Sequence, residues 1–134
     1  MSLLTSFDIG ATGLTAQAMR LNVISSNIAN VESVSGPDGR AYRARQVVFT
    51  AIPTPNKAGS GVAVTEIVES KEPFRRENRP GHPKADPAGY VDMPNVNPVE
   101  EMVNMISAQR SYQMNIEAMN VSRQLMLKTL DLGK

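Results

Sequence analysis

The sequence predicts an α+β fold in which two long terminal helices pair as an antiparallel, coiled-coil-like layer, with a small β-rich, loop-rich insert between them. Two observations support this prediction. All 9 prolines lie between Pro37 and Pro98, so both ends of the chain are free to be helical. Both ends also repeat apolar residues every three or four positions, whereas the middle alternates apolar and polar residues. The expected units are a discontinuous helical core, residues 1–31 and 98–134, and an outer segment, residues 32–97.

The N-terminal segment carries one continuous apolar stripe. Nine positions follow an unbroken three-four spacing and seven of them are apolar, which is typical of a helix that faces another helix. The apolar positions are Leu3, Phe7, Leu14, Leu21, Ile24, Ile28 and Val31, and the other two are Gly10 and Gln17. Only Asp8 and Arg20 are charged in this stretch, so we expect protein around the helix in its working state.

The C-terminal segment opens with a helix start signal. Asn97 suits the N-cap, Pro98 the first helical position, and Glu100 lies three residues after the cap. The stripe that follows consists of Met102, Met105, Gln109, Tyr112, Ile116, Met119, Arg123, Met126 and Leu130. Further apolar residues lie off this stripe, which predicts a helix that contacts two or more neighbours and ends at Gly133.

The middle of the chain is predicted to form strands and turns. Apolar and polar residues alternate in residues 42–52 and again in residues 61–68, and a third short run covers residues 89–93. Residues 80–89 contain three prolines and two glycines, so we expect them to be irregular.

Composition excludes several classes of protein. The chain has 134 residues, enough for one domain, and no cysteine, which rules out disulfides, thiolate nucleophiles and the common zinc frameworks. A net charge of +1 predicts no long-range attraction to nucleic acid or to an acidic membrane. The first residues lack the features of a cleaved secretory signal, and no apolar run reaches the roughly 18 residues of a membrane-inserted helix.

Side chains that could carry chemistry are few. His82 is the only histidine, and although Asp86 and Asp92 are near it in sequence, a catalytic metal usually takes three protein ligands, so a loop histidine is the favoured interpretation. Residues 71–84 carry five Lys or Arg against two Glu, a net charge of +3. Because Phe74 is the one aromatic residue there, a solvated basic edge is favoured over nucleic-acid binding. We predict no catalytic, cofactor-binding or metal-binding residue and no small-molecule substrate.

Asparagine is frequent in both terminal segments, although it is a mediocre helix former. One interpretation is that these side chains make hydrogen bonds between helices that fix the register, and the other is that they are neutral surface positions. The residues concerned are Asn22, Asn27, Asn30, Asn104, Asn115 and Asn120.

Two terminal motifs resemble those of a known family. The first lies in residues 6–31, where Gly13, Leu14, Gln17 and Leu21 precede the sequence ISSNIANV at positions 24–31. The second begins with NVNPVEEM at positions 95–102 and ends with AQRSYQ at positions 108–113. In order and spacing, both motifs resemble those of the bacterial flagellar rod and hook proteins, and the short length and the lead-in at residues 89–94 are similar to the proximal rod members.

The resemblance implies a structural, non-enzymatic subunit of the proximal rod in the flagellar basal body. Its helices would form the innermost layer of a tubular drive shaft that crosses the periplasm and transmits torque from motor to hook. The implied partners are other rod proteins, further copies of the chain, and the flagellar type III export apparatus, which would export the chain unfolded without signal cleavage.

Residues on the two motifs are the ones expected at subunit contacts. They are Leu14, Gln17, Leu21, Ile24, Asn27, Ile28, Asn30, Val31, Met102, Met105, Gln109, Tyr112, Ile116 and Met119. The main alternative function is a soluble coiled-coil adaptor, which should form a defined small oligomer in isolation. A weaker alternative is a small hydrolase centred on His82.

Overall fold

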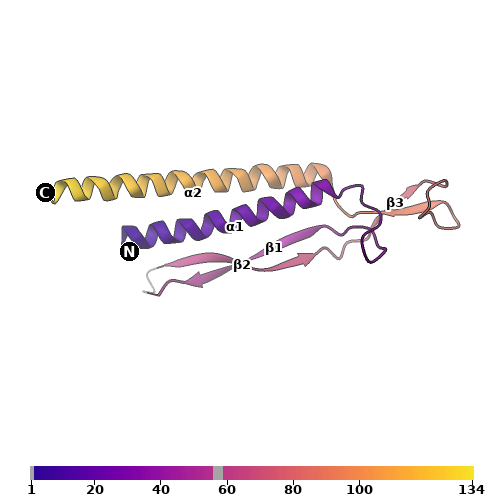
Figure 1. Cartoon of the computed structure of the whole chain (residues 1–134), viewed down its shortest axis with the longest axis horizontal. Coiled ribbons are helices and arrows are strands. Elements are labelled where there is room, and N and C mark those ends of the chain that lie inside the picture. Colours follow the sequence, from indigo (N-terminus) through magenta and orange to yellow (C-terminus); the bar gives the residue numbers. More distant parts are fainter. Residues whose placement is uncertain (1, 56–58) are drawn as a thin grey trace.

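The computed structural model describes residues 2–55 and 59–134, so Met1 of the predicted helical core lies outside the described residues. The chain is elongated (Figure 1), with helix α1 at Leu3–Ala29 and helix α2 at Pro98–Leu132. Four strands lie between the helices: β1 at Arg45–Pro53, β2 at Ser60–Glu69, β3 at Arg75–Asn78 and β4 at Tyr90–Met93. They form two small antiparallel sheets, β1–β2 and β3–β4. The predicted α+β fold is confirmed.

Short polar side chains define both ends of α1. At its start, Ser2 Oγ accepts a hydrogen bond from the Thr5 N–H (3.1 Å), as an N-cap does. At its end, the Ser26 carbonyl accepts hydrogen bonds from both the Asn30 side chain, at Nδ2 (2.8 Å), and the Asn30 backbone N–H (3.1 Å). The helix therefore ends at Ala29, slightly before the limit of the predicted stripe.

Helix α2 begins and ends where the sequence predicts. Asn97 Oδ1 accepts hydrogen bonds from the backbone N–H groups of Val99 (3.1 Å) and Glu100 (3.3 Å), and Pro98 fills the first helical position. At the other end, the Gly133 N–H bonds to carbonyls of the last turn at 3.2 Å.

The two helices run antiparallel and in close contact (Figure 1). A Cβ atom added to Gly10 would lie 2.8 Å from Met119 Cγ, and one added to Gly13 would lie 3.0 Å from Asn115 Nδ2. Both distances are shorter than normal van der Waals contacts. The side chains of Met119 and Asn115 therefore occupy space that a larger residue at these positions would need.

The stripe that α2 turns toward α1 differs from the predicted stripe at every second position. Met105, Tyr112 and Met119 are half-buried, in agreement with the prediction. At the alternate positions, the buried or half-buried residues are Glu101, Ala108 and Asn115 in place of the predicted Met102, Gln109 and Ile116. Met102, for example, is 53% exposed. The predicted stripe follows the largest apolar residues, whereas the observed contact uses smaller and polar ones.

The predicted stripe of α1 is displaced in the same way. Gly13 and Asn27 are buried. The three residues that each follow a position facing α2 are only half-buried: Leu14, Leu21 and Ile28. At Gly13 an added Cβ would meet Asn115 of α2, so the contact uses a small residue there. The leucines are therefore placed along the flanks of α1 rather than between the helices.

The β1–β2 hairpin forms a third layer, and α1 lies between it and α2 (Figure 1). The strands pair from Arg45 opposite Glu69 to the hairpin end, with one irregularity in register between Val48 and Phe49. Thr12 of α1 joins the layers, because its Oγ1 accepts a hydrogen bond from the Val62 N–H at 3.1 Å.

The largest fully buried apolar side chains, Met93 and Val91, lie beyond the paired helices, in strand β4. Met93 is 0% exposed, and Val91 and Val96 are also buried. The predicted strand at residues 89–93 is confirmed as β4. Its partner β3 was not predicted from the sequence, since Arg75–Asn78 contains no apolar residue to give an alternating pattern.

Residues 80–89, which are irregular as predicted, form a polar loop closed by Asp86. Its Oδ1 accepts a hydrogen bond from the Tyr90 N–H (2.9 Å), and its other oxygen pairs with Arg76. The Tyr90 N–H, together with the Arg76 charge, holds the pKa of Asp86 below its usual value.

Replacing Met93 by alanine should lower the free energy of unfolding by about 2–5 kcal/mol, because it leaves a cavity in the most buried part of the chain. The matched control is Met102→Ala, an identical change at an exposed position of α2, which should change the stability by about 0.5 kcal/mol or less. Urea unfolding followed by tyrosine fluorescence measures both. Equal effects of the two changes would contradict the assignment of the core to β4.

Candidate subunit interface

Asn27 of α1 is the polar centre of the joint between the three layers. It is 1% exposed, and its Oδ1 accepts hydrogen bonds from the Arg45 N–H (3.0 Å) and the Tyr42 hydroxyl (2.9 Å). Its Nδ2 donates to the Arg45 carbonyl (2.8 Å) and to Glu101 Oε2 (3.2 Å). A carboxamide has two donor hydrogens and two acceptor sites, so all four are used. This confirms, for Asn27, the prediction of a hydrogen bond between the helices.

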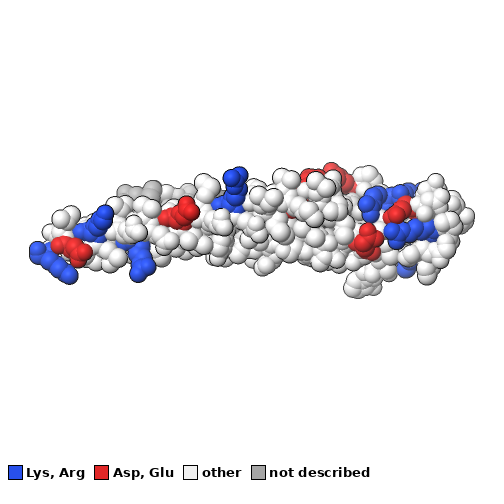
Figure 2. Space-filling model, turned by 90° about the horizontal axis from the view of Figure 1, so that it is seen from above, with Lys and Arg blue, Asp and Glu red and all other residues white. Residues whose placement is uncertain are grey.

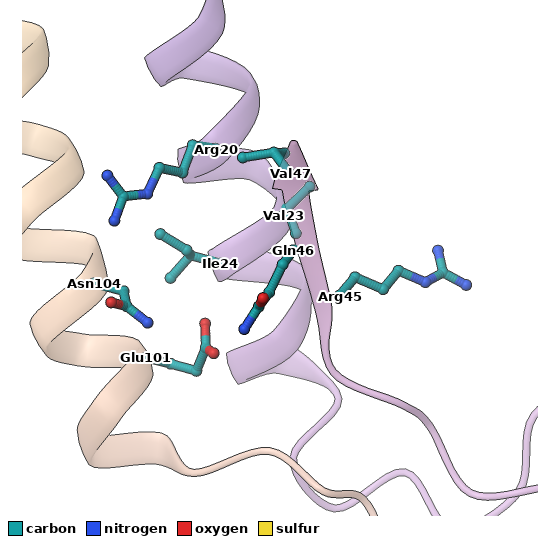
Figure 3. A pocket seen from close by; sticks show the side chains of 8 residues that line it. All are labelled: Arg20, Val23, Ile24, Arg45, Gln46, Val47, Glu101 and Asn104. Atoms are coloured by element: carbon teal, nitrogen blue, oxygen red, sulfur yellow. The ribbon is translucent and has the colours of Figure 1, made fainter. Parts of the chain in front are cut away.

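A pocket of about 180 Å³ lies beside this joint, between α1, α2 and the start of β1. Figure 3 shows the Glu101 carboxylate pointing into it, with Asn104 on the same helix and Arg20 on α1 across from it. Burial, with a smaller contribution from the Glu100 charge, raises the pKa of Glu101 above its usual value, against the opposing effects of the Asn27 hydrogen bond and the Arg20 charge.

The outer face of α2 exposes many large apolar side chains. Among the elements of residues 2–55 and 59–134, α2 contacts only α1, so its other faces meet solvent. Val103 is 60% exposed. Figure 2 shows charged side chains scattered along the helices and gathered at both ends of the molecule. Large apolar side chains exposed on α2 are Val99, Met102, Val103, Ile106, Met114, Ile116, Val121, Leu125, Leu127, Leu130 and Leu132. Large apolar side chains exposed in this number are typical of a protein interaction site.

The structure divides the residues expected at subunit contacts into three groups. Ile24 and Asn27 are buried inside the subunit. Those half-buried along the flanks of the helices or at the end of α1 are Leu14, Gln17, Leu21, Ile28, Asn30, Val31, Met105, Tyr112 and Met119. Those exposed on the outer face of α2 are Met102, Gln109 and Ile116. Only the exposed and half-buried groups can reach a neighbouring molecule in this conformation.

One feature of the interface was missed by sequence reasoning. Glu101 is buried against Asn27, although a glutamate in the first turn of a helix reads as a solvated capping residue. The outer face of α2 includes Val103 and Ile106, which lie off the predicted stripe. Their signal was present in the breadth of the apolar pattern, which predicted more than one neighbour.

The structure gives no support to chemistry at the lone histidine. His82 Nδ1 accepts a hydrogen bond from the Lys84 N–H (3.0 Å), which makes it part of the polar loop. Within residues 2–55 and 59–134, no three His, Asp or Glu side chains come together as metal ligands would. In the same part of the chain, neither helix combines the length and apolar character needed to cross a membrane.

The part of the basic stretch nearest β3 is neutralised within the chain. Arg76 pairs with Asp86 and Asp92, and Arg79 pairs with Glu77 (3.2 Å) and Glu32 (3.7 Å). These exposed pairs contribute little stability, but they reduce the local positive charge.

Comparison with known proteins covers the whole chain. The sequence is 54% identical over 134 residues, and over 100% of both chains, to the flagellar basal-body rod protein FlgC of Escherichia coli O6:H1 and to that of Salmonella typhimurium. It is 41% identical to the FlgC of Borreliella burgdorferi, with 97% of each chain covered. The chain belongs to the FlgC family of flagellar basal-body rod proteins. The family resemblance inferred from the terminal motifs is thereby confirmed.

Two segments of this FlgC-family chain also match broader families. Residues 7–37 match the family described as flagella basal body rod protein, and residues 88–132 match the family described as flagellar basal body rod FlgEFG protein C-terminal. The first segment contains most of α1 and Asn27, and the second contains β4 and α2 with Glu101. The Asn27–Glu101 hydrogen bond therefore joins the two matched segments.

Replacing Glu101 by glutamine should make unfolding of the isolated subunit less dependent on pH. Because the folded state raises the pKa of Glu101, it binds this proton more tightly than the unfolded state does, and stability falls as pH rises from the usual glutamate range through the folded pKa. Glutamine keeps the acceptor for Asn27 without the buried charge, so Glu101→Gln should be the more stable protein at neutral pH and lose its advantage in acid.

Urea unfolding at a series of pH values measures this difference. The matched control is Glu117→Gln, the same substitution at an exposed position of α2, which should follow the pH profile of the unmodified chain. A Glu101→Gln protein that is less stable at neutral pH and more stable in acid would show that the carboxylate is favoured in the folded state.

Proposed function

We propose that the chain is a structural, non-enzymatic subunit of the proximal rod. It assembles with copies of itself and with other rod proteins into the tubular drive shaft that transmits torque from motor to hook. Membership of the FlgC family supports this function. The observation that most directly supports this function is the set of large apolar side chains exposed on α2, which one subunit does not bury by itself.

In this proposal the helices of residues 1–31 and 98–134 form the inner layer and residues 32–97 face outward. The contacts include the half-buried flanks of α1, at Leu14, Leu21 and Ile28, and the exposed face of α2, at Met102 and Ile116. Burying apolar surface contributes about 25 cal/mol per Å², so a helix face repeated in every subunit is a strong source of assembly free energy.

Replacing Val103 or Ile106 by aspartate should stop rod assembly without unfolding the subunit. Both side chains are exposed, so the isolated protein should lose about 0.5 kcal/mol or less. In the rod, each aspartate would be an unpaired charge in an apolar contact, which costs several kcal/mol per subunit. Motility on soft agar and electron microscopy of basal bodies measure assembly.

The matched control is Gly81→Asp, which introduces the same charge into the polar loop at a position with open space around it. Cells carrying it should swim and build normal rods. Normal rods with aspartate at both positions 103 and 106 would remove the α2 face from the interface, and loss of motility on His82→Ala with rods intact would favour an activity in the middle segment.

The proposed route to the rod is export through the flagellar type III apparatus with the N-terminus uncut. The chain recovered from purified basal bodies should therefore yield, by mass spectrometry, a peptide that includes Ser2 and Leu3. Recovery of only chains that lack about the first 20 residues would instead indicate a cleaved secretory signal.

The alternative function, a soluble coiled-coil adaptor, makes a different prediction. An adaptor should form one defined small oligomer in isolation, whereas a rod subunit that needs the growing structure should remain mostly monomeric at the same concentration. Light scattering coupled to size-exclusion chromatography distinguishes them.

A further inference from the structure

Four cationic side chains of the outer segment are left without a partner. Lys71, Arg75 and Lys84 belong to the basic stretch noted in the sequence, and Arg40 lies on the turn that follows α1. All four are exposed, and in the described part of the chain their side chains make neither an ion pair nor a hydrogen bond. The ion pairs around β3 therefore leave positive charge available to another molecule.

Two of these free cations, Arg40 and Lys84, line the same hollow, which has a volume of about 220 Å³. The charged residues around it are three cations, the third being Arg76, and two carboxylates, Asp86 and Asp92. Arg76 pairs with both carboxylates, so neither of them neutralises Arg40 or Lys84. The lining has a net charge of +1, and the hollow lies at the β3 end of the molecule, where charged side chains gather (Figure 2).

Hydrogen bonds hold the backbone of Arg40 in place at one side of this hollow. The Gly36 N–H donates to the Arg40 carbonyl (2.7 Å), and the Gly39 N–H donates to the Gly36 carbonyl (3.0 Å). Gly39 has a φ of +76°, a left-handed conformation that favours glycine. The Asp38 carboxylate accepts from the Arg40 backbone N–H (3.1 Å) and forms no ion pair with its guanidinium. The turn therefore presents a free guanidinium from a fixed backbone.

Lys84 is held in a similar way by the polar loop. Its backbone N–H donates to His82 Nδ1 (3.0 Å), and the Ala85 N–H donates to the His82 carbonyl (2.9 Å). Between the two cations the lining includes Val91, which is 1% exposed, and the buried Ala41. Fixed backbones reduce the entropy lost on binding, and a nearby apolar surface strengthens an ionic hydrogen bond.

These features suit one small anion. We propose that the hollow binds a carboxylate side chain, of Asp or Glu, that is presented by another rod protein. A guanidinium matches the two oxygens of a carboxylate, and the ammonium of Lys84 adds a second positive charge. A polymer such as nucleic acid gains affinity from many phosphate contacts, whereas the hollow offers two free cations. This inference rests on the proposed rod function and names the chemistry of one of its contacts.

Titration of the purified chain with an acetylated, amidated tri-glutamate peptide tests the proposal. The peptide should shift the NMR signals of the Ala41 and Val91 backbone amides in a saturable way, and a tri-lysine peptide should not. The double variant Arg40→Gln with Lys84→Gln should bind the tri-glutamate peptide about tenfold more weakly, because two charged donors are lost. Both positions are exposed, so the rest of the amide spectrum should be unchanged.

The matched control is Lys71→Gln with Arg75→Gln, which removes the same two charges from exposed, unpaired side chains outside the hollow. This double variant should bind the tri-glutamate peptide as the unmodified chain does. Equal weakening by both double variants would show only a general attraction between charges and overturn the proposal. Inorganic phosphate that shifts the same amides at lower concentrations than the peptide would also overturn it, in favour of a phosphate site.

Swimming cells test whether the contact is used in the rod. Cells with the Arg40 and Lys84 changes should spread more slowly on soft agar than cells with the Lys71 and Arg75 changes. Equal spreading, with the chain present in basal bodies, overturns the contact and leaves the rod function standing. Absence of the unmodified chain from basal bodies overturns the rod function, and the peptide titration then decides the carboxylate site separately.

Discussion

The side chain of Asn27 is the constraint on which the rest of the structure depends. Its four hydrogen bonds reach the backbone of β1, the Tyr42 hydroxyl and the Glu101 carboxylate, so one buried amide joins α1 to the hairpin and to α2. A buried polar group with every site satisfied specifies one arrangement, because any shift of register leaves a donor or an acceptor unpaired. An aspartate of the same shape could not replace it, since it would turn two donors into an acceptor facing a carbonyl and a carboxylate.

Glycine at three positions leaves space that side chains of a neighbouring element occupy. Gly10 and Gly13 let α2 approach α1 on one side, and Gly61 lets β2 approach on the other, where an added Cβ would lie 2.8 Å from Thr12 Oγ1. Glycine is costly inside a helix, by about 1 kcal/mol relative to alanine. That cost is compensated here by contacts that a larger residue would prevent, so the propensity of the isolated segment and the packing of the folded chain oppose each other.

Local signals in the sequence were sufficient to predict both helices, the Asn97 cap and most of β1, β2 and β4. Prolines and capping residues determine the backbone conformation of their near neighbours in sequence, so their effect can be predicted without the fold. Which side of each helix contacts the other helix was not predictable in the same way. A stripe chosen by apolar size selects Leu14 and Met102, whereas the contact is decided by how near two backbones can come, which depends on Gly13 and on a partner far away in sequence. Strand β3 has no apolar residue, and it exists because β4 offers a paired edge. Glu101 was unpredictable for the same reason, since its burial depends on Asn27.

The distribution of apolar residues explains how a chain with a well-specified fold can still be incomplete. Inside the subunit, the helices meet through glycine, alanine, asparagine and methionine, while most of the leucine and valine of α2 faces outward. The largest buried apolar side chains, Met93 and Val91, lie elsewhere, in strand β4. Two requirements are thereby separated: the core and the Asn27 joint fix the shape of the subunit, and the apolar surface of the helices remains available. Because that surface gains free energy only when it is covered, the helices have more to gain from neighbouring molecules than from their own chain.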